Sequence, residues 1–151
     1  GYRVTLEPVP VEDGSAARLQ AAFRAAGWQV RAEPCDINHV LHVGGRSFAE
    51  YWESRPGPLR TTLNRKGSKV ETRILTAFDP EAWAAYEAIY RASWKPAEGD
   101  PAMLRAFAQG EGAAGRLRLA LALHEGTPVA AQFWTVERGT AYIHKLAHLE
   151  S

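Results

Sequence analysis

The last third of the chain follows the strictest hydrophobic pattern in the sequence. Between residues 117 and 123, leucine occupies every second position and alternates with arginine or alanine. A period of two is typical of a strand that buries one face. Tight-turn sequences at residues 125–127 and 138–139 separate this run from two further apolar stretches, residues 129–136 and 142–146. Three consecutive strands joined by tight turns form an antiparallel meander, and we expect the fold to contain one.

A strand and two helices are expected before the meander. Residues 72–78 have a strand pattern, and Asp79 followed by Pro80 is typical of a helix start. That helix carries a ridge of four aromatic residues, Trp83, Tyr86, Tyr90 and Trp94. We expect this ridge mainly in the core, and Trp94 is the best candidate among the four to line a pocket. A second helix is expected from Pro101 to about Gln109, and a glycine-rich loop after it.

The first half of the chain predicts shorter elements. We expect strands over residues 3–9, 28–32 and 37–43, and a helix from Ser15 that Gly27 stops. Ser47 is placed to cap a short helix. A longer helix is expected over residues 59–71, with a narrow buried stripe formed by Leu59, Leu63 and Val70.

Composition is that of an ordinary folded domain. Hydrophobic residues make up 46% of the 151 residues, charged residues 23%, and the net charge is +1, so no global charge favours nucleic acid or a membrane. The single cysteine, Cys35, allows no intrachain disulfide, which is consistent with the cytoplasm, and it has no neighbouring base that would make it a nucleophile. No apolar run reaches the roughly 18–20 residues that a membrane span needs.

Three stretches carry a family resemblance. They are SFAEYWESRPGPLRTTLNRKGSK (residues 47–69), EAWAAYEAIYRASWK (residues 81–95) and LRLALALHEGTPVAAQFWTVERGTAYIHKLAH (residues 117–148). Together they resemble bacterial GNAT acyltransferases of the cellulose-biosynthesis type, which are related to the Fem family of tRNA-dependent ligases. The order of elements from Thr72 onward is also similar to the first half of a GNAT domain.

The resemblance implies an α/β fold, α+β by some schemes, with a mixed, mostly antiparallel sheet flanked by helices from parts of two lobes. Residues 1–46 would be the closing half of a first lobe, residues 47–71 basic connecting helices, and residues 72–151 the opening half of a second lobe. The implied activity is transfer of an acyl group from acetyl-CoA or another acyl-CoA to an amine by direct attack. GNAT proteins hold the CoA pyrophosphate on a glycine-rich loop that opens a helix. That loop is expected beyond Ser151, so this chain alone is expected to be inactive.

A basic helix is the first candidate site. It carries four cationic side chains, Arg60, Arg65, Lys66 and Lys69. These side chains would hold the phosphates of an anionic or nucleotide-linked amine acceptor. A solvated helix face is the alternative interpretation of the same residues. The run lacks interleaved aromatic residues, so nucleic acid is less favoured, with tRNA as the exception under a Fem-type reaction.

The last two strands carry the second group of candidates. A histidine suits the base that takes the proton of the attacking amine, so we expect His144 and Tyr142 at the reaction centre. Ideal alternation puts these two and His148 on one face of the sheet and Lys145, which would polarise the acyl carbonyl or bind phosphate, on the other. Gln132 and Trp94 are expected to contact substrate. No acidic residue or cysteine completes a metal site with the histidines, so no metal is expected.

Two alternative functions remain open at this point. One is tRNA-dependent aminoacyl transfer of the Fem type, and the other is a non-catalytic module that binds a partner or acts as a scaffold. A meander that stops at its third strand leaves that strand's outer edge unpaired. We therefore also expect pairing with another chain, including a second copy, or a poorly ordered end.

Overall fold

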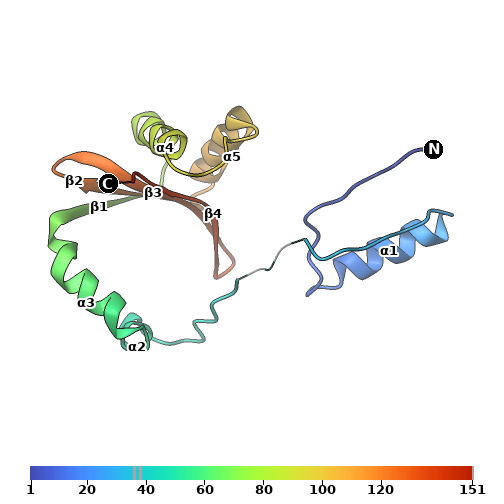
Figure 1. The fold of residues 1–151 in the computed structure, drawn as a ribbon, viewed down its shortest axis with the longest axis horizontal. Coiled ribbons are helices and arrows are strands. Elements are labelled where there is room, and N and C mark those ends of the chain that lie inside the picture. The colour runs from blue at the N-terminus through green and yellow to red at the C-terminus, as the bar shows by residue number, and fades with distance from the viewer. Residues whose placement is uncertain (36, 38, 151) are drawn as a thin grey trace. The chain divides into compact units, whose positions relative to one another are not determined.

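The computed structural model describes residues 1–35, 37 and 39–150, which divide into unit 1 (Gly1–Phe48) and unit 2 (Ala49–Ser151). Unit 2 contains a four-stranded antiparallel sheet of order β1-β2-β3-β4. Its strands are β1 (Val70–Leu75), β2 (Leu117–His124), β3 (Thr127–Glu137) and β4 (Thr140–His148). Helices α4 (Pro80–Ala92) and α5 (Pro101–Ala113) lie on the same face of this sheet (Figure 1). The expected α/β architecture, with an antiparallel meander and flanking helices, is confirmed.

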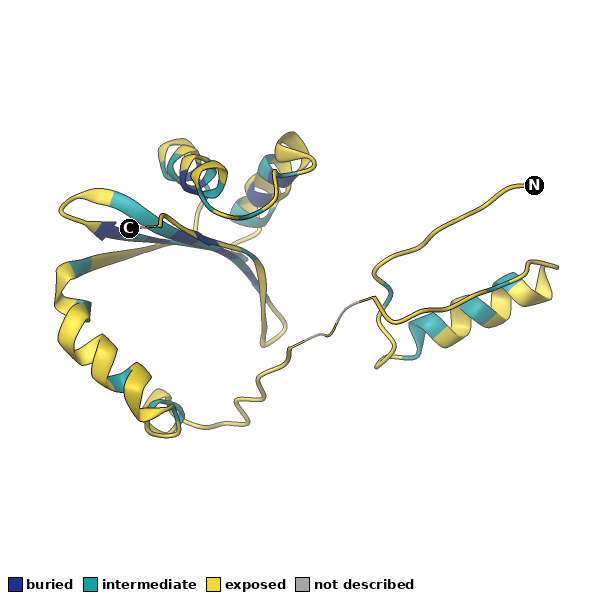
Figure 2. Ribbon diagram, viewed as in Figure 1, coloured by how far each residue is buried: buried dark blue, intermediate teal, exposed yellow. Residues whose placement is uncertain are grey.

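The core of the protein lies between the sheet and these two helices. All four alternating leucines of β2 are buried, together with Ala131 and Phe133 of β3. From the helix side, α4 contributes Trp83, Tyr86 and Ile89, and α5 contributes Leu104 and Ala108. Figure 2 shows the buried residues concentrated in these elements. The alternation in β2 therefore predicts correctly which face of the sheet is buried.

Both core helices begin where the sequence predicts. The Asp79 carboxylate accepts a hydrogen bond from the backbone N–H of Ala82, and Asp100 accepts one from that of Met103. Each carboxylate satisfies an N–H group that has no partner within its helix, and proline follows each cap. The expected aromatic ridge divides as predicted, because Trp83 and Tyr86 are buried whereas Trp94, beyond the end of α4, is 53% exposed.

Helix α5 is longer than the sequence predicts. The expected loop glycines Gly110 and Gly112 lie inside the helix, which continues to Ala113. A β-carbon on Gly112 would lie 2.7 Å from the backbone nitrogen of Phe78, so this helix approaches the chain before α4 too closely for any side chain. Glycine is required at this position for packing rather than for a turn.

Two alanine substitutions in α5 are expected to change stability in opposite directions. Gly112→Ala should lower the free energy of unfolding by about 1–3 kcal/mol, because its methyl group overlaps the Phe78 backbone. Gly110→Ala is the matched control, because no atom lies within 4 Å of its β-carbon position. It should raise the free energy by roughly 0.5–1 kcal/mol through helix propensity. Urea denaturation of both variants measures the difference, and equal effects would contradict this assignment.

The connecting region departs from the expected helix over residues 59–71. Helix α2 (Phe48–Glu53) forms as predicted, but α3 (Gly57–Lys66) is followed by a 3₁₀ turn, η1 (Gly67–Lys69), and Val70 already belongs to β1. The predicted buried stripe is wrong, because Leu59 and Leu63 are 50% and 51% exposed. Val70 leaves the helix because it pairs with His124 in the sheet, and β-branched residues suit strands. Strand β1 consequently begins and ends earlier than predicted.

Among the described residues before Phe48, the predicted helix forms as α1 (Ser15–Ala25). The expected strands over residues 3–9 and 28–32 are wrong, as is the part of the 37–43 strand within the described residues; residue 38 lies outside them. Strands need a hydrogen-bonded neighbour, and the described part of this unit contains no ladder to pair them. The assignment of residues 1–46 to a first lobe stays a prediction.

Candidate active site on strand β4

A β-bulge determines which side chains of β4 face the helices. Phe133 of β3 pairs with Lys145, but the next residue, Trp134, pairs with Ile143, so His144 is an extra residue in β4. A bulge of this kind re-aims side chains, and bulges occur often beside active sites. Both His144 and Lys145 contact residues on the helix-covered side. The predicted placement of these two residues on opposite faces is therefore wrong, because simple alternation does not hold across a bulge.

The His144 ring lies against two aromatic rings and one hydroxyl group. Its centroid is 5.2 Å from that of Phe107 in α5 and 5.0 Å from that of Phe133. Its Nε2 atom lies 2.8 Å from Oγ1 of Thr135, a β3 residue that is only 5% exposed. The residue nevertheless keeps contact with solvent, because β4 is an edge strand. His144 is thus held in position on one side and accessible on the other.

The surroundings of His144 favour its neutral form. Burial lowers the pKa of His144 below its ordinary value of 6.5, Glu111 raises it, and the Lys145 ammonium lowers it. Glu111 itself is paired with Arg116 at 2.6 Å, and this guanidinium together with His144 lowers the pKa of the Glu111 carboxyl. A neutral imidazole at neutral pH is the protonation state that a general base needs.

Lys145 is held by an acid that the sequence does not single out. Its Nζ atom lies 2.6 Å from Oε2 of Glu98, in the loop between α4 and α5, and 5.4 Å from the ring centroid of Tyr90. The lysine and glutamate side chains are 26% and 19% exposed. This ion pair joins the loop to β4 beside His144. The Lys145 ammonium therefore already has a carboxylate partner in this structure.

Breaking this ion pair is expected to destabilise the protein more than breaking an exposed one. Lys145→Ala leaves the largely buried Glu98 carboxylate without its partner and should lower the free energy of unfolding by about 1–3 kcal/mol. Arg73→Ala is the control, because the Arg73–Glu71 pair is about 60% exposed on both sides. It should change stability by less than about 1 kcal/mol. Urea denaturation compares the two variants, and an equal loss would contradict this expectation.

The other predicted residues of this region lie in different places. Tyr142 pairs with Thr135 near His144 and is 52% exposed. The His148 ring lies 4.5 Å from the Trp94 ring, at the other end of β4.

Tyr86, although close in sequence to the predicted substrate-contacting Trp94, is buried, and burial raises the pKa of its hydroxyl. Tyr86 therefore stays neutral and is not a base.

Gln132 faces the side of the sheet opposite to His144. It lies between buried Ala131 and Phe133 in β3, and its Oε1 accepts a hydrogen bond of 2.9 Å from Nε1 of Trp134. With Ile74 and Arg118 it borders a shallow hollow of about 280 Å³ on the face that α4 and α5 leave open. The sheet itself separates Gln132 from the His144 site, so these two residues do not contact the same small substrate group.

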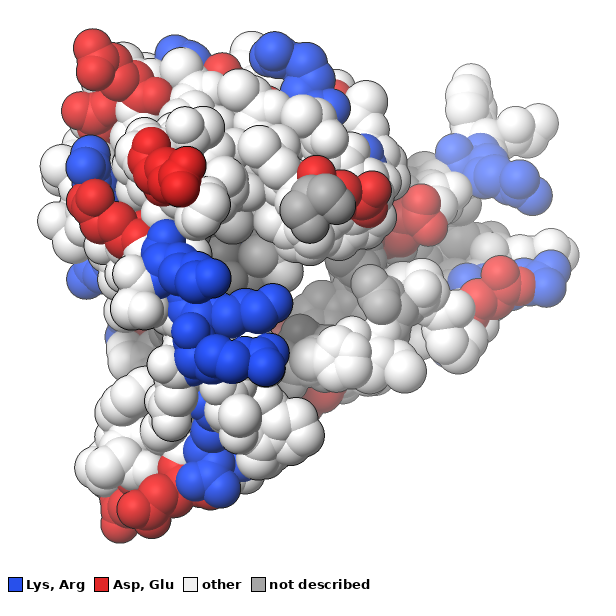
Figure 3. Space-filling view, turned by 60° about the vertical axis from the view of Figure 1, so that its left-hand side comes forward, with Lys and Arg blue, Asp and Glu red and all other residues white. Residues whose placement is uncertain are grey.

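The predicted basic residues all lie on α3 and η1. Arg65, Lys66 and Lys69 are exposed, and Arg60 is half-buried with an Nε atom that has no hydrogen-bond partner. None of the four forms an ion pair with the acidic residues that the structure describes. Residues 54–70 contain no acidic residue. Figure 3 shows lysine and arginine side chains in a column along this part of unit 2. Among the described residues, these four cations are therefore not neutralised by ion pairs.

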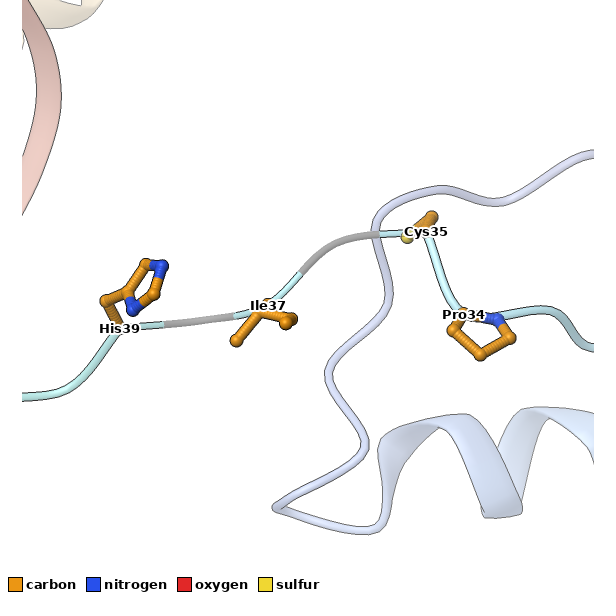
Figure 4. A pocket seen from close by; sticks show the side chains of 4 residues that line it. All are labelled: Pro34, Cys35, Ile37 and His39. Atoms are coloured by element: carbon orange, nitrogen blue, oxygen red, sulfur yellow. The ribbon is translucent and has the colours of Figure 1, made fainter.

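Other features of the chain do not form a site. Pro34, Cys35, Ile37 and His39 border a hollow in an extended segment of unit 1, but they point to different sides of the chain (Figure 4). The described residues contain no group of three or more histidine, cysteine or acidic side chains placed to hold a metal. Within the same residues, no helix is long and apolar enough to cross a bilayer.

A pyrophosphate group is not accommodated at the starts of the core helices. The N-termini of α4 and α5 carry Asp79 and Asp100, each of which accepts one backbone N–H of the first turn and places a negative charge where an anion would bind. Gly110 and Gly112 lie within α5 and do not open a helix. These helix starts therefore do not fit the pyrophosphate of a CoA donor.

Sequence reasoning missed Thr135, Glu98 and Glu111. Thr135 follows Ala131 and Phe133 at inward positions of β3, so a polar residue at a core position was the available signal. Glu98 and Glu111 carry no comparable signal, because their partners, Lys145 and His144, come close only through the fold.

Comparison with known proteins identifies one family. The model of a family described as "Acetyltransferase (GNAT) domain" matches residues 58–151. That range includes α5, the complete sheet and every predicted site residue. No curated protein matches the chain.

Proposed function

Since the chain belongs to the GNAT acetyltransferase family, we propose that it transfers an acyl group from acyl-CoA to an amine acceptor by direct attack. The family membership supports acyl transfer in general. The choice of an acyl-CoA donor follows what GNAT domains generally use. The choice of an amine acceptor and of direct attack rests on the position of His144.

The observation that carries this proposal is the position and state of the His144 imidazole. It is partly open to solvent and contacts Phe107, Phe133 and Thr135, and burial lowers its pKa below the ordinary value, which favours the neutral form. A protonated amine becomes a nucleophile when it loses a proton and regains its lone pair, and His144 is placed to accept that proton. Tyr142, which pairs with Thr135, lines the same side of β4. Lys145 supports the site through Glu98 rather than acting on the acyl carbonyl.

The basic surface of α3 and η1 supports an acceptor that carries phosphate. Arginine binds phosphate bidentately, and four cations without local acidic partners favour an anionic group over a neutral one. A nucleotide-linked amine would combine both requirements, with its phosphates on the basic surface. Trp94 and Gln132 stay proposed substrate contacts for parts of the acceptor away from His144.

Charge removal on this surface is expected to weaken acceptor binding and reduce its salt dependence. The test variant replaces Arg65, Lys66 and Lys69 with glutamine, and inorganic pyrophosphate serves as the probe. We expect affinity to fall by about tenfold or more, because each lost charged hydrogen bond is worth roughly 1.5–3 kcal/mol. The control replaces Arg3, Arg18 and Arg24 of unit 1 with glutamine, at equal change in net charge. Equal loss in both variants would mean that the α3 surface is not the phosphate site.

In this proposal the acyl-CoA donor is a substrate, and α4 and α5 do not bind its CoA part. We derive no role for these helices toward the pyrophosphate, because Asp79 and Asp100 occupy their N-termini. What the described residues contribute is the base and the surface that would hold the acceptor.

The transfer assay uses the natural full-length protein with labelled acetyl-CoA and a panel of amines. The panel contains amino acids, amino sugars, polyamines and nucleotide-linked amino sugars, and mass spectrometry detects N-acetylated products. We expect a product from a phosphate-bearing amine. Release of free acetate without any N-acetyl product would contradict amine transfer.

One observation favours a second candidate function. The unneutralised basic run of α3 and η1, together with helix starts that do not fit pyrophosphate, suits a tRNA-linked donor in a Fem-type reaction. Binding of aminoacyl-tRNA in preference to acetyl-CoA would favour this function. The tandem lobes of that branch and a cytoplasmic location stay proposals. Pairing with another chain through β4 also stays a proposal, and the position of β4 at the edge of the sheet is compatible with it.

A further inference from the structure

A polar side chain is buried in the row of β3 residues that faces the helices. Ala131, Phe133 and Thr135 alternate inward, and Thr135 is 5% exposed. A buried hydroxyl group is unfavourable unless it has a hydrogen-bond partner. Its partner here is Nε2 of His144, at 2.8 Å. The hydroxyl thus joins the core of the sheet to the side chain that the bulge directs toward the helices.

This contact decides which histidine nitrogen can receive a proton. A neutral imidazole has one N–H group and one lone pair, and the hydrogen bond of one nitrogen fixes the role of the other. Nε2 lies against buried Thr135, so a substrate can approach only Nδ1. If the Thr135 hydroxyl donated to Nε2, Nδ1 would carry the hydrogen and accept nothing. Nδ1 is a base only if Nε2–H donates to the threonine oxygen.

We propose that Thr135 is the positioning residue of the base: its oxygen accepts Nε2–H of His144, which leaves the Nδ1 lone pair for the proton of the acceptor amine. This inference rests on the proposed function. In the step, the amine N–H bond breaks, the proton moves to Nδ1, and the electron pair left on nitrogen forms a bond to the acyl carbon. The bond between that carbon and the thioester sulfur of the acyl-CoA donor then breaks, and CoA leaves as the thiolate with the electron pair of this bond. The imidazolium that forms keeps its Nε2–H bond to Thr135 and later releases the Nδ1 proton to solvent.

The charged groups around His144 are consistent with a proton that is only transiently held. Glu111 from α5 favours the imidazolium, and Lys145 on β4 disfavours it. Arg116, which pairs with Glu111, reduces the negative charge that the ring experiences. Without a free carboxylate beside it, His144 can release the proton again after each transfer.

The first test measures the tautomer of His144 directly. Nitrogen-15 NMR of the natural protein, labelled in its histidines and assigned with His144→Gln, should show the Nε2–H form at pH 7.5. Thr135→Val removes the hydroxyl at nearly the same shape and should abolish this preference, whereas Thr135→Ser should keep it. A wild-type Nδ1–H form, or an unchanged tautomer in Thr135→Val, would overturn the proposal. This readout needs no acyl transfer, so its failure differs from failure of the proposed function.

The second test compares the same variants in the transfer reaction. Thr135→Val should lower kcat by about tenfold, the effect of one hydrogen bond, with KM unchanged. Thr135→Ser should retain most of the activity. The acid limb of the pH–rate profile should also shift in Thr135→Val but not in Thr135→Ser. A lower kcat in both variants with an unshifted pH profile would indicate a structural role only and contradict the assignment. Circular dichroism confirms that each variant is folded.

Discussion

Replacing His144 with glutamine is expected to lower the rate of acyl transfer by a factor on the order of 10² to 10⁴, the usual contribution of a positioned general base. Glutamine keeps a polar group near Thr135 but accepts no proton at neutral pH. The loss should fall on kcat, because the proton moves only in the reaction and not in substrate binding. Steady-state kinetics with the best acceptor from the amine panel measures it.

The dependence of the transfer rate on pH is a further expected result for His144. Because the pKa of His144 lies below 6.5, the wild-type rate should stay high on the acid side of 6.5 and fall only as the imidazole becomes protonated. The unfolded chain binds that proton more readily, so the contribution of His144 to stability is also lost as the pH falls below 6.5. His144→Gln should show neither effect from this group.

His124→Gln is the matched control for the kinetic prediction. His124 is exposed at the end of β2, where it pairs with Val70 and Thr127 away from the β4 bulge. This variant should keep both the rate and the acid limb of the wild type. An equal loss in the two variants, or an unchanged rate in His144→Gln, would remove His144 from the reaction.

Truncating Trp83 to alanine is expected to produce the largest loss of stability, about 3–5 kcal/mol. Trp83 is fully buried and lies at the centre of an aromatic cluster, with ring centroids 4.7 Å from Tyr86, 5.3 Å from Phe133 and 5.7 Å from Phe78. Its Nε1 donates a hydrogen bond of 2.7 Å to Glu87. Since whole domains are stable by only about 5–15 kcal/mol, much of the population would unfold in mild denaturant.

Trp94→Ala is the control for this stability prediction. It removes the same side chain from a position that is 53% exposed, where its ring contacts His148. We expect a change below about 1 kcal/mol. Urea denaturation followed by far-ultraviolet circular dichroism measures both variants. A similar loss for the two tryptophans would contradict the placement of the core between α4 and the sheet.

The fold of unit 2 could be predicted where hydrophobic periodicity and helix caps agree. The alternating leucines of β2 and the caps at Asp79 and Asp100 define elements that the structure confirms. Prediction failed where packing decides the outcome. Gly112 looks like a loop residue in sequence, but it is a helix residue because Phe78 lies against it. The strands expected in unit 1 had suitable local patterns, but the described residues of that unit contain no strand for them to pair with.

The site was predictable by residue type but not by arrangement. A histidine on the last strand could be recognised as a base candidate, yet the bulge beside Trp134 leaves His144 unpaired and brings it to the same side of the sheet as Lys145. No sequence pattern indicates that Glu98 reaches Lys145, because 47 positions separate them and only the loop after α4 brings them together. Contacts between distant residues depend on register, and one extra residue changes the register.

The most direct test of acyl-CoA-dependent transfer is calorimetric titration of acetyl-CoA and of free CoA into the natural full-length protein. The proposed function predicts saturable binding of both ligands to the full-length protein. Absence of binding to the full-length protein would contradict the acyl-CoA donor and favour the tRNA-dependent reaction.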